Sequence, residues 1–145
     1  MSSMREILFR GKRLDNVEWV HGSFCMDAVE QFNGVCGVDG FIRLYEKTKG
    51  KMQMHEVDRE TVGQYVGLKD KNGKRIFEGD ILGTRYYYLS PDNVAVEVVK
   101  WFCNSWAIQE GDRPPMLLEE DGILPYSEAI GNVHDNKELW GGNEQ

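Results

Sequence analysis

The segment around Asn72-Gly73 limits the possible folds of this chain more than any other part of the sequence. Asparagine followed by glycine supplies the positive φ angles of a tight type I′ turn. Residues suited to strands lie on both sides of it, in 61–68 before the turn and from Arg75 after it. The segment therefore predicts a hairpin of two antiparallel strands.

Short strands and turns of the same kind recur along the rest of the chain. Runs rich in β-branched and aromatic residues, several of them alternating in period two, predict two hairpins near the N-terminus and further strands after residue 59. A helical turn is expected at 135–140. The predicted strands cover 7–11, 17–24, 41–45, 52–57, 61–68, 75–84, 85–89, 94–101, 105–108 and 129–133.

These elements predict a mainly β protein. Residues 1–58 are expected to form an N-terminal β-hairpin region, 59–140 a small SH3-like β-barrel that ends in a short helical turn, and 141–145 a flexible tail. Gly79-Asp80 is expected to form a β-bulge that bends a strand into the barrel. The two prolines and the charges of 111–122 predict a mobile loop.

Charge and composition exclude several classes of protein. The net charge is −7, and residues 101–145 carry two basic against nine acidic residues, which argues against binding to duplex nucleic acid. No apolar stretch is long enough to cross a membrane and no signal peptide is recognisable, so we expect a cytoplasmic location. The spacing of Cys25, Cys36 and Cys103 fits neither disulfides nor a zinc site and predicts reduced thiols.

No pattern of residues indicates catalysis, a cofactor or a metal. His21, His55 and His134 fall in separate elements, and a metal site would need them to converge. The glycines of 34–40 lack the preceding strand and following helix of a nucleotide-binding loop. The basic residues of 69–75 are interrupted by acidic ones and suit a solvated hairpin tip. We therefore expect no catalytic, cofactor-binding or metal-binding residues.

Tyr86 and Tyr88 are the candidates for an interaction surface. In a strand they lie on one face, while Tyr87 lies on the other. Exposed tyrosines are enriched at interfaces between proteins. The two rings are expected either to mediate self-association or to pack on the N-terminal hairpins.

Three segments carry a resemblance to a known family. Residues 62–82, which read VGQYVGLKDKNGKRIFEGDIL, resemble the signature of the YopX family of phage and prophage proteins. Residues 4–10 and the Ile-Gly-Asn segment of 129–139 resemble its two ends. The resemblance implies a phage or prophage origin, a barrel-like C-terminal portion and a homo-oligomer. It implies no catalytic or binding residues.

Together these observations favour a non-enzymatic, oligomeric module that binds or assembles with a host or phage protein. A hydrolase or nuclease is the alternative, and a concave pocket holding carboxylates of raised pKa would favour it. A second alternative is an acidic mimic of DNA that inhibits a host enzyme, suggested by the acidic residues between 110 and 128. The sequence alone does not choose among these functions.

Overall fold

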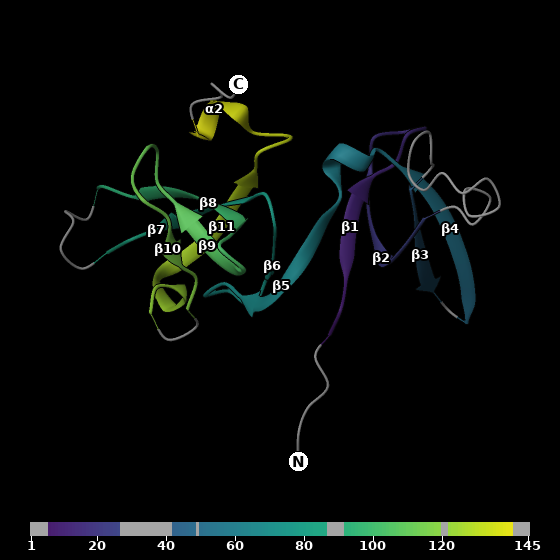
Figure 1. Cartoon of the computed structure of the whole chain (residues 1–145), viewed down its shortest axis with the longest axis horizontal. Coiled ribbons are helices and arrows are strands. Elements are labelled where there is room, and N and C mark those ends of the chain that lie inside the picture. Colours follow the sequence, from purple (N-terminus) through teal and green to yellow (C-terminus); the bar gives the residue numbers. More distant parts are fainter. Residues whose placement is uncertain (1–5, 27–41, 49, 87–91, 120–121, 141–145) are drawn as a thin grey trace, which may run out of the picture. The chain divides into compact units, whose positions relative to one another are not determined.

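The protein is mainly β, as the sequence predicts, with two antiparallel sheets, and the helical elements among its described residues are short turns (Figure 1). It divides into two compact units, Met1–Tyr65 and Val66–Gln145, a few residues after the predicted boundary at residue 58. Within the described part of the chain, no helix has the length and apolar character needed to span a lipid bilayer. The computed structural model describes residues 6–26, 42–48, 50–86, 92–119 and 122–140.

Some of the sequence-based predictions fall on residues outside these ranges. They are the glycine-rich segment 34–40 and the tail 141–145. The strand predicted at 85–89 lies mostly outside the described residues as well.

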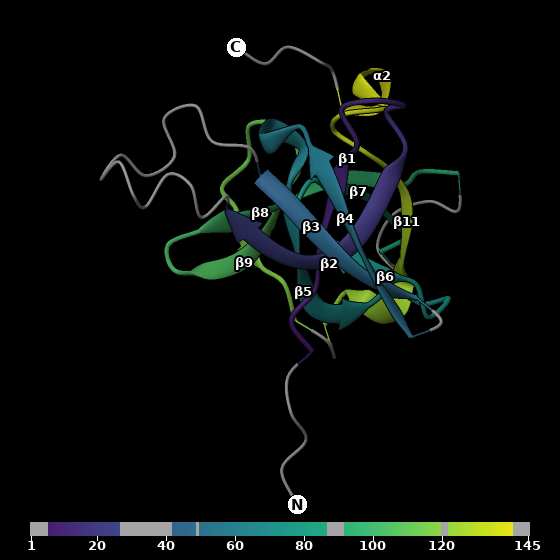
Figure 2. The same ribbon diagram turned by 90° about the vertical axis from the view of Figure 1, so that its right-hand side faces the viewer.

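The first unit contains the two predicted N-terminal hairpins. Its strands lie side by side in the order β4-β3-β2-β1, with the beginning of β5 next to β1 (Figures 1 and 2). Leu44 and Val57 are buried between the half-buried side chains of Phe9, Val20 and Val62. The elements are β1 (Phe9–Lys12), β2 (Trp19–Met26), β3 (Ile42–Thr48), β4 (Lys51–Val57) and the 3-10 turn η1 (Arg59–Thr61).

The turn between β1 and β2 holds Val17 in an unfavourable backbone conformation, with φ at 53°. A β-branched residue rarely adopts a positive φ, and the strain costs about 1–3 kcal/mol. Val17 is exposed, so its replacement loses little packing. Val17→Asn should raise the free energy of unfolding by about 1 kcal/mol in urea denaturation, because asparagine tolerates this region. The control Val17→Ile keeps the branched carbon and should give no gain.

The second unit is built around a sheet in the order β10-β9-β8-β7-β11. This sheet is open, with β10 and β11 at its edges, and the six-stranded sheet that ends in β6 is open too. The closed SH3-like barrel expected from the sequence is therefore not confirmed. The elements are β5 (Gly63–Lys69), β6 (Arg75–Phe77), β7 (Asp80–Thr84), β8 (Ala95–Phe102), β9 (Ser105–Gln109), β10 (Met116–Leu117), η2 (Leu124–Tyr126), β11 (Ser127–Asn132) and α2 (Lys137–Trp140).

Two local predictions for this unit need correction. Gly79, with φ at 90°, lies in a turn between β6 and β7 instead of a bulge within one strand, and the Asp80 carboxylate accepts from the Phe77 amide at 2.8 Å. The described part of the predicted loop 111–122 contains strand β10, because the two prolines end just before Met116 and leave the following amides free to donate.

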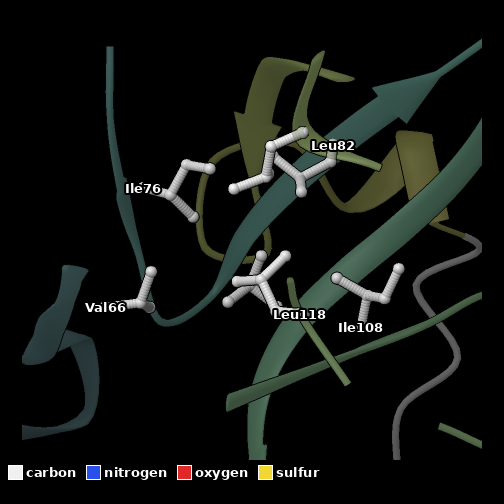
Figure 3. Packing of buried hydrophobic residues seen from close by; sticks show 7 residues of the cluster. Val66, Ile76, Leu82, Ile108 and Leu118 are labelled. Atoms are coloured by element: carbon white, nitrogen blue, oxygen red, sulfur yellow. The ribbon is translucent and has the colours of Figure 1, made fainter. Parts of the chain in front are cut away.

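The core of the second unit draws side chains from β5, β6, β7, β8 and β9 and from the segment after β10. Figure 3 shows several of these side chains converging on one another. Ile76 and Leu82 have no exposed surface. The buried members are Val66, Ile76, Leu82, Val99, Ile108, Leu118 and Leu124.

Asp70 ties the Asn72-Gly73 hairpin to β11. Its Oδ1 accepts from the backbone amides of Asn72 and Lys74, both at 2.9 Å. Its Oδ2 accepts from the backbone amide of Ala129, 59 positions away, at 2.9 Å. A single buried carboxylate therefore fixes the turn and also joins it to an edge strand of the neighbouring sheet.

Candidate functional site

A buried glutamate stands in the middle of the apolar strand β8. Alternation along the strand places Glu97 on the same face as Ala95 and Val99, and in the sheet it lies opposite Leu82 of β7. Its side chain is consequently enclosed, and Glu97 is only 2% exposed. Acidic side chains are rarely buried to this degree unless other polar groups bind them.

Two hydroxyl groups bind the Glu97 carboxyl group. The Tyr86 hydroxyl donates to Oε2 at 2.5 Å, and Thr84 Oγ1 lies 2.6 Å from Oε1. Burial raises the pKa of Glu97 above its ordinary value, because a charged carboxylate is poorly solvated there. The two hydroxyls partly oppose this rise in pKa, and the negative charge of Glu110 adds to it.

Glu97 and Tyr86 line a pocket of about 320 Å³ in the second unit. Strands β8 and β9 are antiparallel, and Val98 pairs with Gln109. Continuing this register places Glu110, the next residue after β9, opposite Glu97. Glu110 forms an ion pair with Arg113 at 3.4 Å. The lining residues are Tyr86, Glu97, Ile108, Glu110, Arg113, Pro114, Pro115 and Met116.

This arrangement combines apolar walls with a small set of polar groups, as is usual in ligand-binding pockets. A carboxyl group of raised pKa keeps its proton to a higher pH than an ordinary glutamate and, while protonated, can donate it in a hydrogen bond. A concave pocket with one carboxyl group of raised pKa is therefore present, whereas several such carboxyl groups are expected of an enzyme. It does not by itself identify a reaction.

The structure places one of the two predicted interaction residues in this pocket. Tyr86 is half-buried with its hydroxyl on Glu97, whereas Tyr88 lies outside the described residues. Their role in self-association stays a prediction. Sequence reasoning missed Glu97, although a signal was available: it is the one acidic residue in a strand of valines, in phase with the inward residues.

The other residues considered from the sequence do not join this pocket. The ring of His55 lies 3.2 Å from Glu46 in the first unit, and the His134 amide donates to Asn132 in the second. Among the described residues no group of three or more His, Cys, Asp or Glu side chains is placed to hold a metal ion. The basic residues between 69 and 75 are exposed, as expected of a hairpin tip.

A larger groove of about 770 Å³ runs over the other face of β8. It is lined mainly by Val94, Val96 and Val98 of this strand and its approach, and by Leu139 and Trp140 of α2. The indole N–H of Trp140 is buried there, and none of the described residues accepts a hydrogen bond from it. We regard the Glu97 pocket as the better candidate site, because it contains the buried carboxyl group with a raised pKa.

Exposed apolar side chains lie near one edge of the second sheet, on both of its faces, because Met116 pairs with Ile108 on one face and Leu117 with Ala107 on the other. Trp101 and Phe102 at the end of β8 and Met116 and Leu117 of the edge strand β10 are each about half exposed, and Leu117 reaches 59%. Strand β9 lies between them. Trp101 also contacts Trp106 of β9 edge to face, with ring centres 4.9 Å apart. We call Trp101, Phe102, Met116 and Leu117 the β10-edge patch.

Comparison with known proteins gives a family and a fold. The sequence model of the family described as YopX protein matches residues 8–140. The crystal structure of protein EF1440 from Enterococcus faecalis is similar, with a TM-score of 0.60 and 20% identity over 94% of this chain and 99% of that chain. No curated protein matches. The likeness to EF1440 supports the fold and carries no activity.

Proposed function

The chain belongs to the YopX family, and from that premise we propose that it is a non-enzymatic module of a phage or prophage that self-associates and binds a phage or host protein. The observation that carries this proposal is the β10-edge patch. Large apolar side chains exposed on both faces beside an edge strand are typical of a sheet edge that another protein covers.

The backbone at the same edge supports the proposal. The Leu118 amide donates to the Trp106 carbonyl at 3.1 Å, so the alternate residue Leu117 turns its own N–H and C=O away from β9. An edge strand with outward backbone groups can pair with an added strand. Two copies of this edge can also pair with each other in a symmetric dimer.

The Glu97 pocket suits the same mode of binding. Met116 belongs to β10 and also lines the pocket, so a strand added at this edge runs next to it. In strand addition, backbone hydrogen bonds supply affinity and side-chain pockets supply selectivity. The pocket is therefore proposed to receive one side chain of the bound segment.

Leu117→Lys tests the proposal directly. A charge on the edge strand disfavours pairing, so we expect the association constant to fall by about tenfold or more, which corresponds to about 1.4 kcal/mol. Light scattering after size-exclusion chromatography at several concentrations measures self-association, and titration calorimetry measures binding to a recovered partner. Leu14→Lys, at an exposed leucine of the first unit, is the matched control. A monomeric wild type that retains no partner would refute the proposal.

The tyrosine alternative can be tested in the same assay. If Tyr88→Ala abolishes association while Leu117→Lys does not, the tyrosine face is the interface and the β10-edge patch is not. Tyr86→Ala is less informative, because it also removes the hydrogen bond to Glu97.

An acid–base enzyme is a second candidate, favoured specifically by the raised pKa of Glu97 in a pocket. We would assay hydrolysis of chromogenic esters, glycosides and phosphoesters by the wild type and by Glu97→Gln. Turnover that Glu97→Gln abolishes would establish this function over the non-enzymatic one. Equal signals from both proteins would remove it.

A further inference from the structure

Four groups in the second unit lie in a row at hydrogen-bonding distance. Glu97 Oε1 lies 2.6 Å from Thr84 Oγ1. Thr84 Oγ1 lies 2.7 Å from Ser127 Oγ, and Ser127 Oγ lies 2.9 Å from the carbonyl oxygen of Ile123. Thr84 and Ser127 have no exposed surface. The row joins β8, β7 and β11 and ends at the residue before η2.

The number of hydrogens available decides how this row is bonded. Three contacts need three hydrogens, and the two hydroxyls supply only two. The Ile123 carbonyl can only accept, so Ser127 donates to it. Thr84 must then donate to Ser127, which leaves the contact between Thr84 and Glu97 without a hydrogen unless the carboxyl group provides one.

We propose that Glu97 is a proton-binding site: in the folded protein it is a neutral carboxylic acid whose Oε1–H donates to Thr84. Its Oε2 is then a carbonyl oxygen that accepts from Tyr86. Every group in the row is satisfied in this arrangement. With an ionised Glu97, Thr84 would donate to the carboxylate and Ser127 would have one hydrogen for both Thr84 and the Ile123 carbonyl, so one of the three contacts would lack a hydrogen.

The charges around Glu97 agree with a neutral acid. Glu110, which directly follows the neighbouring strand β9, repels a negative charge on Glu97 and is itself paired with Arg113 at 3.4 Å. The Tyr86 phenol is the further titratable group on the pocket side, and the groups facing Glu97 from β7 and β11 are uncharged hydroxyls. Burial disfavours the ionised form as well, and raises the pKa of Glu97.

The consequence is a proton-controlled link between the pocket and η2. Loss of the proton turns the Thr84 hydroxyl to the carboxylate and leaves Ser127 one hydrogen for both Thr84 and the Ile123 carbonyl, which keeps the hydrogen bond from the Tyr126 amide at 2.9 Å. The ionisation state of the pocket therefore changes the side-chain bonding at the start of η2. A basic group that enters the pocket and takes the proton would act in the same way. This inference does not depend on the proposed binding function.

Carbon-13 NMR of protein labelled at glutamate carboxyl carbons tests the proposal. Glu97→Gln identifies the Glu97 signal by its absence. We expect that signal to titrate above the ordinary value of 4.5. A midpoint at or below that value would overturn the proposal.

Ser127→Ala distinguishes the two bonding directions. Without Ser127, the Thr84 hydroxyl is free to donate to Glu97 and stabilise the carboxylate, so the midpoint should fall by about half a pH unit or more. Ser105→Ala removes a hydroxyl whose bond is to the Trp106 carbonyl and should leave the midpoint unchanged. A midpoint that stays or rises in Ser127→Ala would contradict the donated proton.

Equilibrium unfolding of the wild type and of Glu97→Gln gives a second test, which does not require Ser127→Ala to fold. The folded pKa of Glu97 is raised, so its contribution to stability is complete below about pH 4.5 and is lost as the pH rises through the folded pKa. Glutamine donates to Thr84 and accepts from Tyr86 at every pH. Glu97→Gln should therefore gain stability relative to the wild type as the pH rises, and a constant difference would contradict the proposal.

Discussion

Asp70→Ala is expected to lower the free energy of unfolding by about 3 kcal/mol, one of the two largest effects predicted for this protein. The substitution deprives three backbone amides, those of Asn72, Lys74 and Ala129, of their acceptor. A hydrogen bond to a charged group contributes about 1.5–3 kcal/mol. The three bonds share one carboxylate and do not add, and water can replace the acceptor at the exposed residues Asn72 and Lys74, so the net loss stays at about 3 kcal/mol. Urea denaturation of the full chain measures the loss.

Two further variants test whether the loss of stability comes from these hydrogen bonds or from removing any acidic residue. Asp70→Asn keeps one acceptor oxygen but turns an NH₂ group toward a backbone donor, so it should lose part of the stability. Asp92→Ala, at an exposed position, should change the free energy of unfolding by less than about 0.5 kcal/mol. An Asp70→Ala loss as small as that of Asp92→Ala would show that the carboxylate does not hold the hairpin to β11.

Leu82→Ala should lower the free energy of unfolding by about 2–5 kcal/mol. Leu82 is fully buried and packs in the core of the second unit (Figure 3), where a truncated side chain leaves a cavity. Leu117→Ala makes the same chemical change at a residue that is 59% exposed and should have an effect below about 0.5 kcal/mol. Equal losses in the two variants would mean that the assigned core is wrong.

Local chemistry accounts for the parts of the fold that the sequence predicts. Asn72-Gly73 allows few arrangements other than a tight hairpin, and period-two alternation in 41–45 and 52–57 predicts the β3–β4 pair. These signals depend on residues that are close together in the chain. The family signature includes Asp70, and the structure now explains its place there: it accepts the hydrogen bonds of its own turn and of β11.

The features that the sequence does not predict depend on distant contacts. The hydroxyls of Thr84 and Ser127 contact each other in the row of hydrogen-bonding groups that includes Glu97. The two residues are 43 positions apart, and no local sequence pattern predicts their contact. Strand β10 has two residues and follows two prolines, so its pairing with β9 is visible only in three dimensions. The predicted closed barrel is not confirmed: the two sheets are open, and β6 and β7, although close in sequence, belong to different sheets.

The placement of the tryptophans makes the two units separable by fluorescence. Trp19 belongs to the first unit, where the guanidinium of Arg10 lies 4.7 Å from its ring centre, whereas Trp101, Trp106 and Trp140 all belong to the second. In Trp19→Phe, indole emission arises from the second unit alone. An unfolding curve from this emission that coincides with the circular dichroism of the β-sheets would show one cooperative transition, and two separated curves would show that the units melt independently.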